Sequence, residues 1–531
     1  MSTLEQCLKL QLPTVWVSTQ DTYRVVNKIV NTARQDVYKV DAFEGLSKWA
    51  DDMWKVILVP SPMNPDELVP IGSVQESVMY VYQHKGSLIV TNAELIAEKL
   101  VEPISVFQEQ YRTTFFKDDV REINSSIYFI SVTDEIPGTY GRNITLIYDD
   151  LPAKEEIDLI YDNIKSVSPI SLGDETNAKQ LSGNSLGLSE SEIISTSLSL
   201  ITQDGYVSSK LMNDARVKYL KSRNIDLIDT EITFEDLGGM DIAKEIIAHS
   251  AKLFNSPEKD VAPINKILLI GVPGCGKSAL CKATANYLGI RLARTGVSHQ
   301  MSKWIGESER NMRQTLASIF AMSPICLWVD ELGRDLSGSG SSNDGGTTDR
   351  VHGEFLTGLQ EMPDNVYLMA AANRVDGLPP EMLRQGRFDE ILFVGFPSQN
   401  ERARIFEIYL KEDSTKFDIN QLAIMSEGFT GAEIENLVKK TRFSVSSGYG
   451  LWDTETLLNM MGETKNLILI RHTNEILNMY TRARQDWQWA SSEQRFESER
   501  VINGDFGPTR LMNLKKQEKQ PVSSHPKATH F

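Results

Sequence analysis

The densest chemical pattern in the chain is a glycine-rich segment that follows a short apolar run. Residues 267–270 are typical of a buried strand, and the next eight residues match the pattern G-x-x-x-x-G-K-[ST]. Glycines in such a loop let successive backbone N–H groups surround an anion at the start of the following helix. The segment therefore predicts a phosphate-binding loop, and the full pattern disfavours a plain strand-to-helix turn. Its residues are Gly271, Val272, Pro273, Gly274, Cys275, Gly276, Lys277 and Ser278.

Three side chains of this loop bear on its chemistry. The ammonium of Lys277 can reach the β- and γ-phosphates of a nucleotide, and the hydroxyl of Ser278 can ligate Mg²⁺. Cys275 allows two interpretations, a thiol whose oxidation stops the site or a small residue that fills the loop. The second interpretation is favoured.

Two later apolar runs end in polar residues that suit the same chemistry. Residues 325–329 lead into Asp330 and Glu331, and residues 366–372 lead into Asn373. In open α/β sheets, ligands bind at the carboxyl ends of the strands. We expect Asp330 to orient the Mg²⁺ shell and Glu331 to polarise the attacking water. The amide of Asn373 could hydrogen-bond the γ-phosphate and that water, or could simply end a strand.

Two arginines follow the apolar run at 366–372. Arg384 and Arg387 lie three residues apart around a glycine turn in the segment 383–389. Their guanidinium groups could reach the γ-phosphate bound by a neighbouring subunit and stabilise the transition state there. Surface salt bridges would explain the charge of this segment, but not its position after the strand that ends at Asn373.

The elements that must position these residues alternate between strand-like and helix-like stretches, which predicts an α/β fold. Over residues 1–165 the pattern favours a mostly parallel sheet covered by helices. The strand-like runs are 13–18, 55–59, 87–91 and 127–132, and the clearest helical run is 23–33. The first strand is followed by Ser-Thr-Gln-Asp-Thr-Tyr, with no G-K-[ST] in the region. We therefore predict a degenerate nucleotide-fold domain without a phosphate loop.

The chain is predicted to contain five segments. They are a degenerate α/β domain at 1–165, a polar loop, small helical subdomain and linker at 166–230, a nucleotide-binding domain at 231–398, a helical lid at 399–450, and a C-terminal extension with a disordered tail at 451–531. Helices are expected at 189–201, 208–223, 400–411 and 431–444, with a tryptophan-bearing helical patch at 486–490.

Composition limits the classes of function. The chain has 531 residues, 41% of them hydrophobic and 24% charged, as in an ordinary globular protein that is too long for one core. No apolar run reaches membrane-spanning length and no signal peptide is seen, so we expect a cytoplasmic or plastid stroma-like compartment. The four cysteines lack metal-ligand spacing. A net charge of −17 disfavours a general nucleic-acid surface, although a local basic pore stays open.

Together these segments resemble the AAA family of ATPases, and within it the chloroplast-reading-frame (Ycf-type) ATPases of plastids and cyanobacteria. Those proteins also have an inactive N-terminal nucleotide-fold domain and a Gly/Ser-rich insert, as at 337–346 here. The resemblance implies an AAA module, a P-loop sheet with a helical lid, that uses ATP and Mg²⁺ in a ring-shaped homo-oligomer, typically a hexamer. It is carried by residues 232–239, 271–278, 302–309, 330–331, 372–374, 383–389 and 430–433.

The resemblance also implies roles for single residues. The adenine pocket would be lined by Asp236, Leu237 and Gly238, and the lid would close over the base with Gly431 and Ala432. Arg384 would act on the neighbouring subunit, with Arg387 as its companion. A substrate-gripping pore loop would contain Lys303, Trp304, Ile305 and Gly306. One departure is Gly333, where the family usually has an aspartate, which bears on how hydrolysis is coupled to pore movement.

These patterns favour an ATP hydrolase that remodels a protein client. One alternative is a nucleotide-gated adaptor that hydrolyses slowly and would function without Trp304. A nucleic-acid loader or helicase accessory is disfavoured by the acidic composition and the lack of a nucleic-acid module. No protease motif is present, so degradation would require a separate partner.

Overall fold

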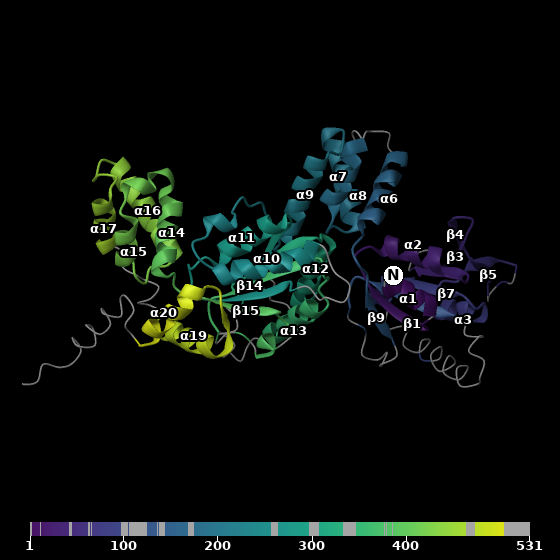
Figure 1. Ribbon diagram of the computed structural model, residues 1–531. Coiled ribbons are helices and arrows are strands. Elements are labelled where there is room, and N and C mark those ends of the chain that lie inside the picture. The colour runs from purple at the N-terminus through teal and green to yellow at the C-terminus, as the bar shows by residue number, and fades with distance from the viewer. Residues whose placement is uncertain are drawn as a thin grey trace, which may run out of the picture. The chain divides into compact units, whose positions relative to one another are not determined.

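The computed structural model forms two compact units, Met1–Arg216 and Val217–Phe531, and each is described by itself (Figure 1). The pore segment 303–306, Gly333, the insert 337–346 and the C-terminal tail lie outside the described residues. The residues that the structure describes are 3–10, 12–41, 45–61, 64, 66–96, 105, 125–134, 136, 144–167, 175–255, 264–296, 307–332, 347–375, 378, 380–384, 386–463 and 473–503.

The first unit is built on a seven-stranded sheet of order β4-β3-β2-β7-β8-β1-β9. The strands from β2 to β9 in this order pair in parallel, and β3 and β4 add an antiparallel edge. This confirms the predicted mostly parallel sheet. The strands are β1 Thr14–Ser18, β2 Val37–Asp41, β3 Gly45–Ala50, β4 Met53–Val56, β7 Ser87–Thr91, β8 Ser126–Ser131 and β9 Thr145–Tyr148.

Helices cover both faces of this sheet, because alternate residues of each strand point to opposite sides. Val15 and Val17 pack with α1 (Thr3–Leu10) and α2 (Thr22–Thr32), whereas Trp16 packs with α3 (Val74–Gln83). A short helix, α4 (Ala93–Ile96), follows β7. Burial on both faces explains why these strands have continuous apolar sequences.

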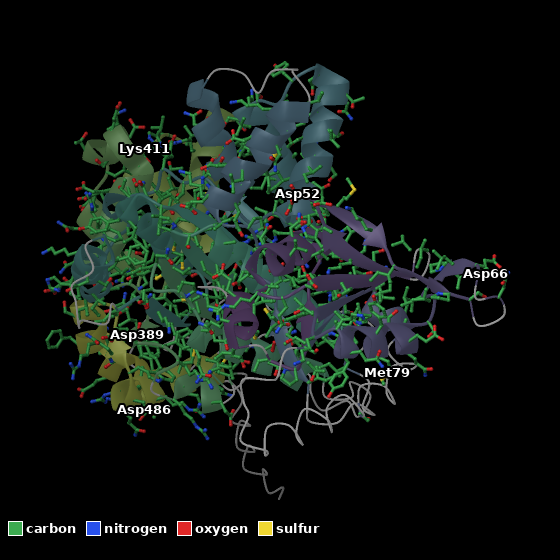
Figure 2. All side chains as sticks on the ribbon, turned by 90° about the vertical axis from the view of Figure 1, so that its right-hand side faces the viewer. Asp52, Asp66, Met79, Asp389, Lys411 and Asp486 are labelled. Atoms are coloured by element: carbon green, nitrogen blue, oxygen red, sulfur yellow. The ribbon has the colours of Figure 1, made fainter. Side chains whose placement is uncertain are left out.

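The expected strand at 55–59 is divided in the structure. Its first residues end β4, and the rest begin β5 (Leu58–Pro60), which pairs with β6 (Leu68–Pro70) in a separate two-stranded ribbon. Asp66, labelled in Figure 2, lies at the outer end of this ribbon. The run is therefore apolar but half exposed, with Ile57 and Val59 packed against the edge of the core while Val56 and Leu58 are exposed.

Four helices complete the region after the first sheet: α6 Lys154–Val167, α7 Glu175–Ser185, α8 Glu190–Asp204 and α9 Ser209–Ser222. The helices predicted at 189–201 and 208–223 are confirmed. The prediction of a loop before them is wrong for α7, where polar residues find partners on other helices. Ser185 shares a hydrogen bond of 2.7 Å with the Tyr161 hydroxyl, and Asn184 donates to the Ser209 carbonyl at 3.2 Å. These bonds satisfy side chains that would otherwise favour a loop.

The second unit has a seven-stranded sheet of order β10-β12-β13-β14-β11-β15-β16, in which only β10 is antiparallel to its neighbour. In chain order, β11 is the first parallel strand of this sheet, and it lies between the fourth and the fifth, β14 and β15. In the first unit, β1 is likewise the first parallel strand and lies between the fourth and the fifth, β8 and β9. The strands are β10 Asp226–Ile228, β11 Lys266–Gly271, β12 Arg291–Gly296, β13 Ile325–Asp330, β14 Val366–Ala372, β15 Glu390–Val394 and β16 Gln488–Trp489.

The helices of the second unit form three groups. Those beside the sheet are α10 Asp241–Asn255, α11 Lys277–Leu288, α12 Glu307–Ala321 and α13 Thr347–Gln360, and those of the lid are α14 Gln399–Leu410, α15 Ile419–Met425, α16 Gly431–Ser446 and α17 Thr454–Glu463. The lid has its own apolar core, which includes Phe406, Leu422 and Leu437. The predicted lid helices are confirmed. Two further helices, α19 Thr473–Asp486 and α20 Ser492–Asn503, follow the lid. No helix in the described part of the chain is long and apolar enough to cross a membrane.

The helical patch predicted at 486–490 is wrong, because Gln488 and Trp489 form strand β16 beside β15. Trp489 is 3% exposed, and its ring lies edge-on to Phe393 with centroids 4.9 Å apart. The Ala490 N–H donates to the Phe393 carbonyl at 2.9 Å. Aromatic packing across a long sequence separation thus overrides the local helical pattern.

In the first unit, the charged side chains that follow β1 bind other groups of the same unit. The Asp21 carboxylate accepts hydrogen bonds from the N–H groups of Glu190, at 2.7 Å, and Ser191, at 3.0 Å, at the start of α8. The buried Arg24 guanidinium pairs with Asp149, whose pKa burial nevertheless raises to about 6. A carboxylate of the chain itself therefore fills the anion position at this helix N-terminus.

We expect Asp21→Ala to loosen the start of α8, because two backbone donors lose their acceptor at a cost of about 1–2 kcal/mol. Hydrogen exchange followed by mass spectrometry should show faster deuterium uptake in peptides from residues 186–200. Asp66→Ala, on the exposed ribbon, is the control and should leave that uptake unchanged. Equal uptake in both variants would contradict the proposed role of Asp21.

Candidate nucleotide-binding site

The glycine-rich loop joins β11 to α11 through close backbone contacts. A Cβ atom at Gly271 would lie 2.0 Å from the Val394 carbonyl oxygen of the neighbouring strand. Gly276, the N-cap of α11, has φ of 94°, which disfavours other residues. Both positions therefore require glycine if the loop is to curl over the end of the sheet.

The side chain of Lys277 is buried under this loop. It is 5% exposed, and its Nζ donates to the carbonyl oxygens of Gly271 at 2.8 Å and Val272 at 2.9 Å. Burial lowers the pKa of the ammonium to about 8, so it stays largely cationic at neutral pH. Two of its three N–H donors are used by the loop, which leaves one for a phosphate oxygen.

The acidic pair lies at the carboxyl end of β13. The Glu331 N–H donates to Asp330 Oδ1 at 3.0 Å, and burial raises the pKa of the Asp330 carboxyl. Glu331 has φ of 49°, a left-handed conformation that is uncommon for this residue type. Because β13, β14 and β11 are adjacent and parallel, Asn373 at the end of β14 emerges at the same edge.

The lid packs directly on the segment that precedes α10. A Cβ atom at Gly238 would lie 2.9 Å from the Glu401 carbonyl oxygen of α14. The first turn of α16 lies on the phosphate loop, since the Ala432 N–H donates to the Gly274 carbonyl at 3.0 Å. A capping box between Thr430 and Glu433 starts this helix at Gly431.

These elements enclose a cleft of about 930 Å³. Most of the predicted site residues line it: Asp236, Leu237, Gly238, Pro273, Gly274, Cys275, Gly276, Lys277, Ser278, Asp330, Glu331, Asn373, Gly431 and Ala432. Gly271 and Val272 are not in its lining and support the loop from below through the Lys277 hydrogen bonds.

The two predicted arginines are not in the lining of the cleft of their own chain, and they differ from each other. The Arg384 side chain is 74% exposed, and its nearest carboxylate oxygen, on Glu381, is 4.0 Å away. Arg387 donates to the Leu356 carbonyl and so ties its segment to α13. Arg384 is therefore open to another molecule, whereas Arg387 has a local structural contact.

Sequence reasoning missed lining residues from the lid and from the segments beside the sheet: Glu231, Ile232, Met240, Ala279, Lys282, Ala371, Ile405, Ile408, Tyr409, Lys411 and Glu435. The Tyr409 hydroxyl donates to Glu435 Oε2 at 3.1 Å, and burial raises its pKa to about 12. Ile405 and Tyr409 are four residues apart and share one helix face. That spacing is visible in the sequence, but only the fold shows that this face meets the cleft.

The residues of the cleft fit a nucleoside triphosphate with Mg²⁺. The loop offers backbone N–H groups and an ammonium to phosphates, and Ser278 and Asp330 could hold the metal ion directly or through water. Within the described ranges, no group of three or more His, Cys, Asp or Glu side chains could hold a metal ion. Mg²⁺ would thus depend on phosphate oxygens for part of its shell.

The fold and the cleft define a P-loop nucleotide-binding protein, and comparisons with known proteins agree. Residues 267–396 match the family described as "ATPase family associated with various cellular activities (AAA)". The "Uncharacterized AAA domain-containing protein ycf46" of Guillardia theta is 27% identical over 483 residues, 88% of this chain and 91% of the relative. Its namesake from Pyropia yezoensis is 30% identical over 348 residues, 64% of this chain and 70% of the relative.

Another relative matches a shorter part of the chain. "Protein CdcH" of Halobacterium salinarum is 33% identical over 220 residues, 40% of this chain and 30% of the relative. The chain belongs to the AAA family of ATPases, among the ycf46-type AAA domain-containing proteins, as its motifs predicted.

The cysteine in the phosphate loop lines the cleft, but little of it is exposed. Cys275 is 7% exposed, and burial raises its pKa to about 12. Cys7, Cys281 and Cys326 are also free and buried, with raised pKa values. The thiolate is the reactive form, so these surroundings favour Cys275 as a filling residue over a redox brake.

We expect Cys275 to react with a thiol reagent such as iodoacetamide on the order of a thousandfold more slowly in the folded chain than in urea, because so little thiolate forms at pH 7.5. Mass spectrometry of the labelled peptide measures this rate. The same peptide in urea is the internal control. Fast labelling of Cys275 in the folded protein would support the redox interpretation instead.

Proposed function

We propose that the chain binds ATP with Mg²⁺ in this cleft and hydrolyses it. The main support is that the phosphate loop, Asp330, Glu331 and Asn373 line one cleft with the lid. Family membership supports a P-loop ATPase in general. The bound Mg²⁺ would neutralise charge on the phosphates.

Each residue then has a separate task. The backbone N–H groups from Gly274 to Ser278 bind phosphate oxygens, and the remaining Lys277 donor reaches the terminal phosphate. Glu331 orients the attacking water and accepts a proton from it, since a carboxylate within hydrogen-bond distance of a water can act as a general base. Asn373 holds the γ-phosphate and the water in line.

We further propose that hydrolysis needs a second copy of the chain. Arg384 is exposed and absent from the lining of its own cleft, so its guanidinium is free to approach the cleft of a neighbour. A guanidinium supplied in this way stabilises charge on the transferred phosphoryl group. Repetition of such a head-to-tail contact closes a ring, for which we propose a hexamer.

The work done by this ring is proposed from the sequence resemblance. ATP binding and hydrolysis would open and close the contacts between subunits and so remodel a protein client. The segment Lys303–Gly306, expected to grip that client, lies outside the described residues. We propose a protein rather than a nucleic acid as the client, in line with the net charge of −17.

Steady-state ATP hydrolysis measured against protein concentration tests the proposal. Wild-type turnover per chain should rise with concentration, because the trans arginine requires assembly. Glu331→Gln should lower kcat about a hundredfold or more by removing the base, and Arg384→Ala should lower it about a thousandfold.

Arg404→Ala is the matched control, since Arg404 is an exposed arginine of the same unit that pairs with a glutamate three residues away, Glu407. It should turn over ATP like the wild type. Tight ATP binding with negligible wild-type turnover at every concentration would refute the hydrolase and favour the nucleotide-gated adaptor. Normal turnover by Arg384→Ala would refute the trans arginine alone.

A further inference from the structure

We propose that residues 473–503, here called the C-terminal brace, position the lid over the nucleotide cleft through a buried pair, Glu401 and Gln494. The C-terminal brace comprises α19, β16 and α20 and lies outside both the cleft lining and the family match at 267–396. The inference rests on the proposed function, because it concerns how tightly the cleft holds its nucleotide.

Glu401 is a carboxylate in the first turn of α14 that is 5% exposed. Its Oε2 accepts hydrogen bonds from the Ser398 N–H at 2.8 Å and from Gln494 Nε2 at 3.0 Å. Its Oε1 accepts from the Met240 N–H at 3.2 Å. A buried carboxylate depends on such donors, so its three partners are held in one arrangement.

The Met240 bond connects this carboxylate to the cleft. Met240 lines the cleft and has φ of 61°, a conformation that needs support from its surroundings. The neighbouring Gly239 has no room for a side chain, because a Cβ atom there would lie 1.9 Å from Glu401 Oε1. Movement of Glu401 would therefore shift the wall of the cleft.

The Gln494 bond connects the same carboxylate to the link between the sheet and the lid. Gln494 is 3% exposed; its Oε1 accepts from the Gly395 N–H at 2.9 Å while its Nε2 donates to Glu401. The adjacent Phe396 N–H donates to the Tyr480 hydroxyl of α19 at 2.7 Å. Residues 395–398 connect β15 to α14, so the C-terminal brace contacts the segment about which the lid would turn.

A third contact holds the start of α10. The Ala243 N–H donates to the Ala490 carbonyl at 3.1 Å, and the Ser492 hydroxyl donates to Asp241 Oδ2 at 2.6 Å. The C-terminal brace thus touches α10, the link at 395–398 and the lid. Figure 1 shows α19 and α20 in yellow, at the end of the second unit where the lid helices also lie. Loosening the C-terminal brace should let these parts move separately.

The rate at which the full chain releases the fluorescent nucleotide mant-ADP, measured by stopped flow, tests the role of the Glu401–Gln494 pair. Gln494→Ala leaves Glu401 with one donor fewer and the buried Gly395 N–H without its acceptor, so release should be roughly tenfold faster. Gln494→Glu should also accelerate release, because two carboxylates would then meet. Arg495→Ala, at an exposed position of the same helix, is the control and should match the wild type.

Glu401→Gln replaces one acceptor oxygen with an NH2 group, so the N–H of Ser398 or of Met240 faces a donor and loses its acceptor. Its release rate should therefore also exceed that of the wild type, and the effects of Glu401→Gln and Gln494→Ala should be less than additive in the double variant, because both changes break the same hydrogen-bonded group. Thermal unfolding of each variant should accompany the rates. Wild-type release in both Gln494 variants, with unchanged unfolding, would overturn the inference while leaving the proposed function intact.

A measurement on the unaltered chain keeps the inference testable if a variant fails to fold. Coupling is reciprocal, so saturating ADP should slow hydrogen exchange in residues 488–503 as well as in the lid. Protection confined to the lid and phosphate loop would overturn the inference. Absence of any mant-ADP binding by the wild type would overturn the proposed function, and this inference with it.

Discussion

Three adjacent parallel strands, β11, β13 and β14, decide where the chemistry of this chain can occur. Each ends in residues of a different kind: a phosphate loop, an acidic pair and an amide. Their register places Ile270 opposite Ala372, and Val329 opposite Ala370, so all three ends open at one edge. The helices and the lid need only close this edge from the sides, because the sheet already aligns the groups proposed to act in hydrolysis.

The parallel strands have the same order in the two units, but the residues that follow the first parallel strand differ in what they bind. In the second unit the loop after the central strand leaves its N–H groups and Lys277 directed at a cleft. In the first unit the corresponding position holds Asp21, whose carboxylate caps α8, and Arg24, which pairs with Asp149. The Asp21 carboxylate thus stabilises the start of α8.

Features set by neighbouring residues could be predicted from the sequence, and features set by distant pairs could not. The β11 loop, the ends of β13 and β14 and the capped helix α16 follow from local patterns, and each occurs where expected. Strand β16 was missed because Trp489 is buried by Phe393, almost a hundred residues earlier. Gln494 was missed for the same reason, because nothing in the local sequence of a polar helix shows that this glutamine is buried against a distant carboxylate.

Two buried charged side chains, one in the lining of the cleft and one behind it, are balanced mainly by main-chain groups. Lys277 is held by two carbonyl oxygens and Glu401 by two N–H groups and one side-chain amide. Removing such charges from water costs several kcal/mol each, and the cost is met during folding. The walls are therefore ordered before a nucleotide arrives, so less of its binding energy goes into arranging them. The lid, joined to the sheet through residues 395–398, is the part left to respond to what the cleft holds.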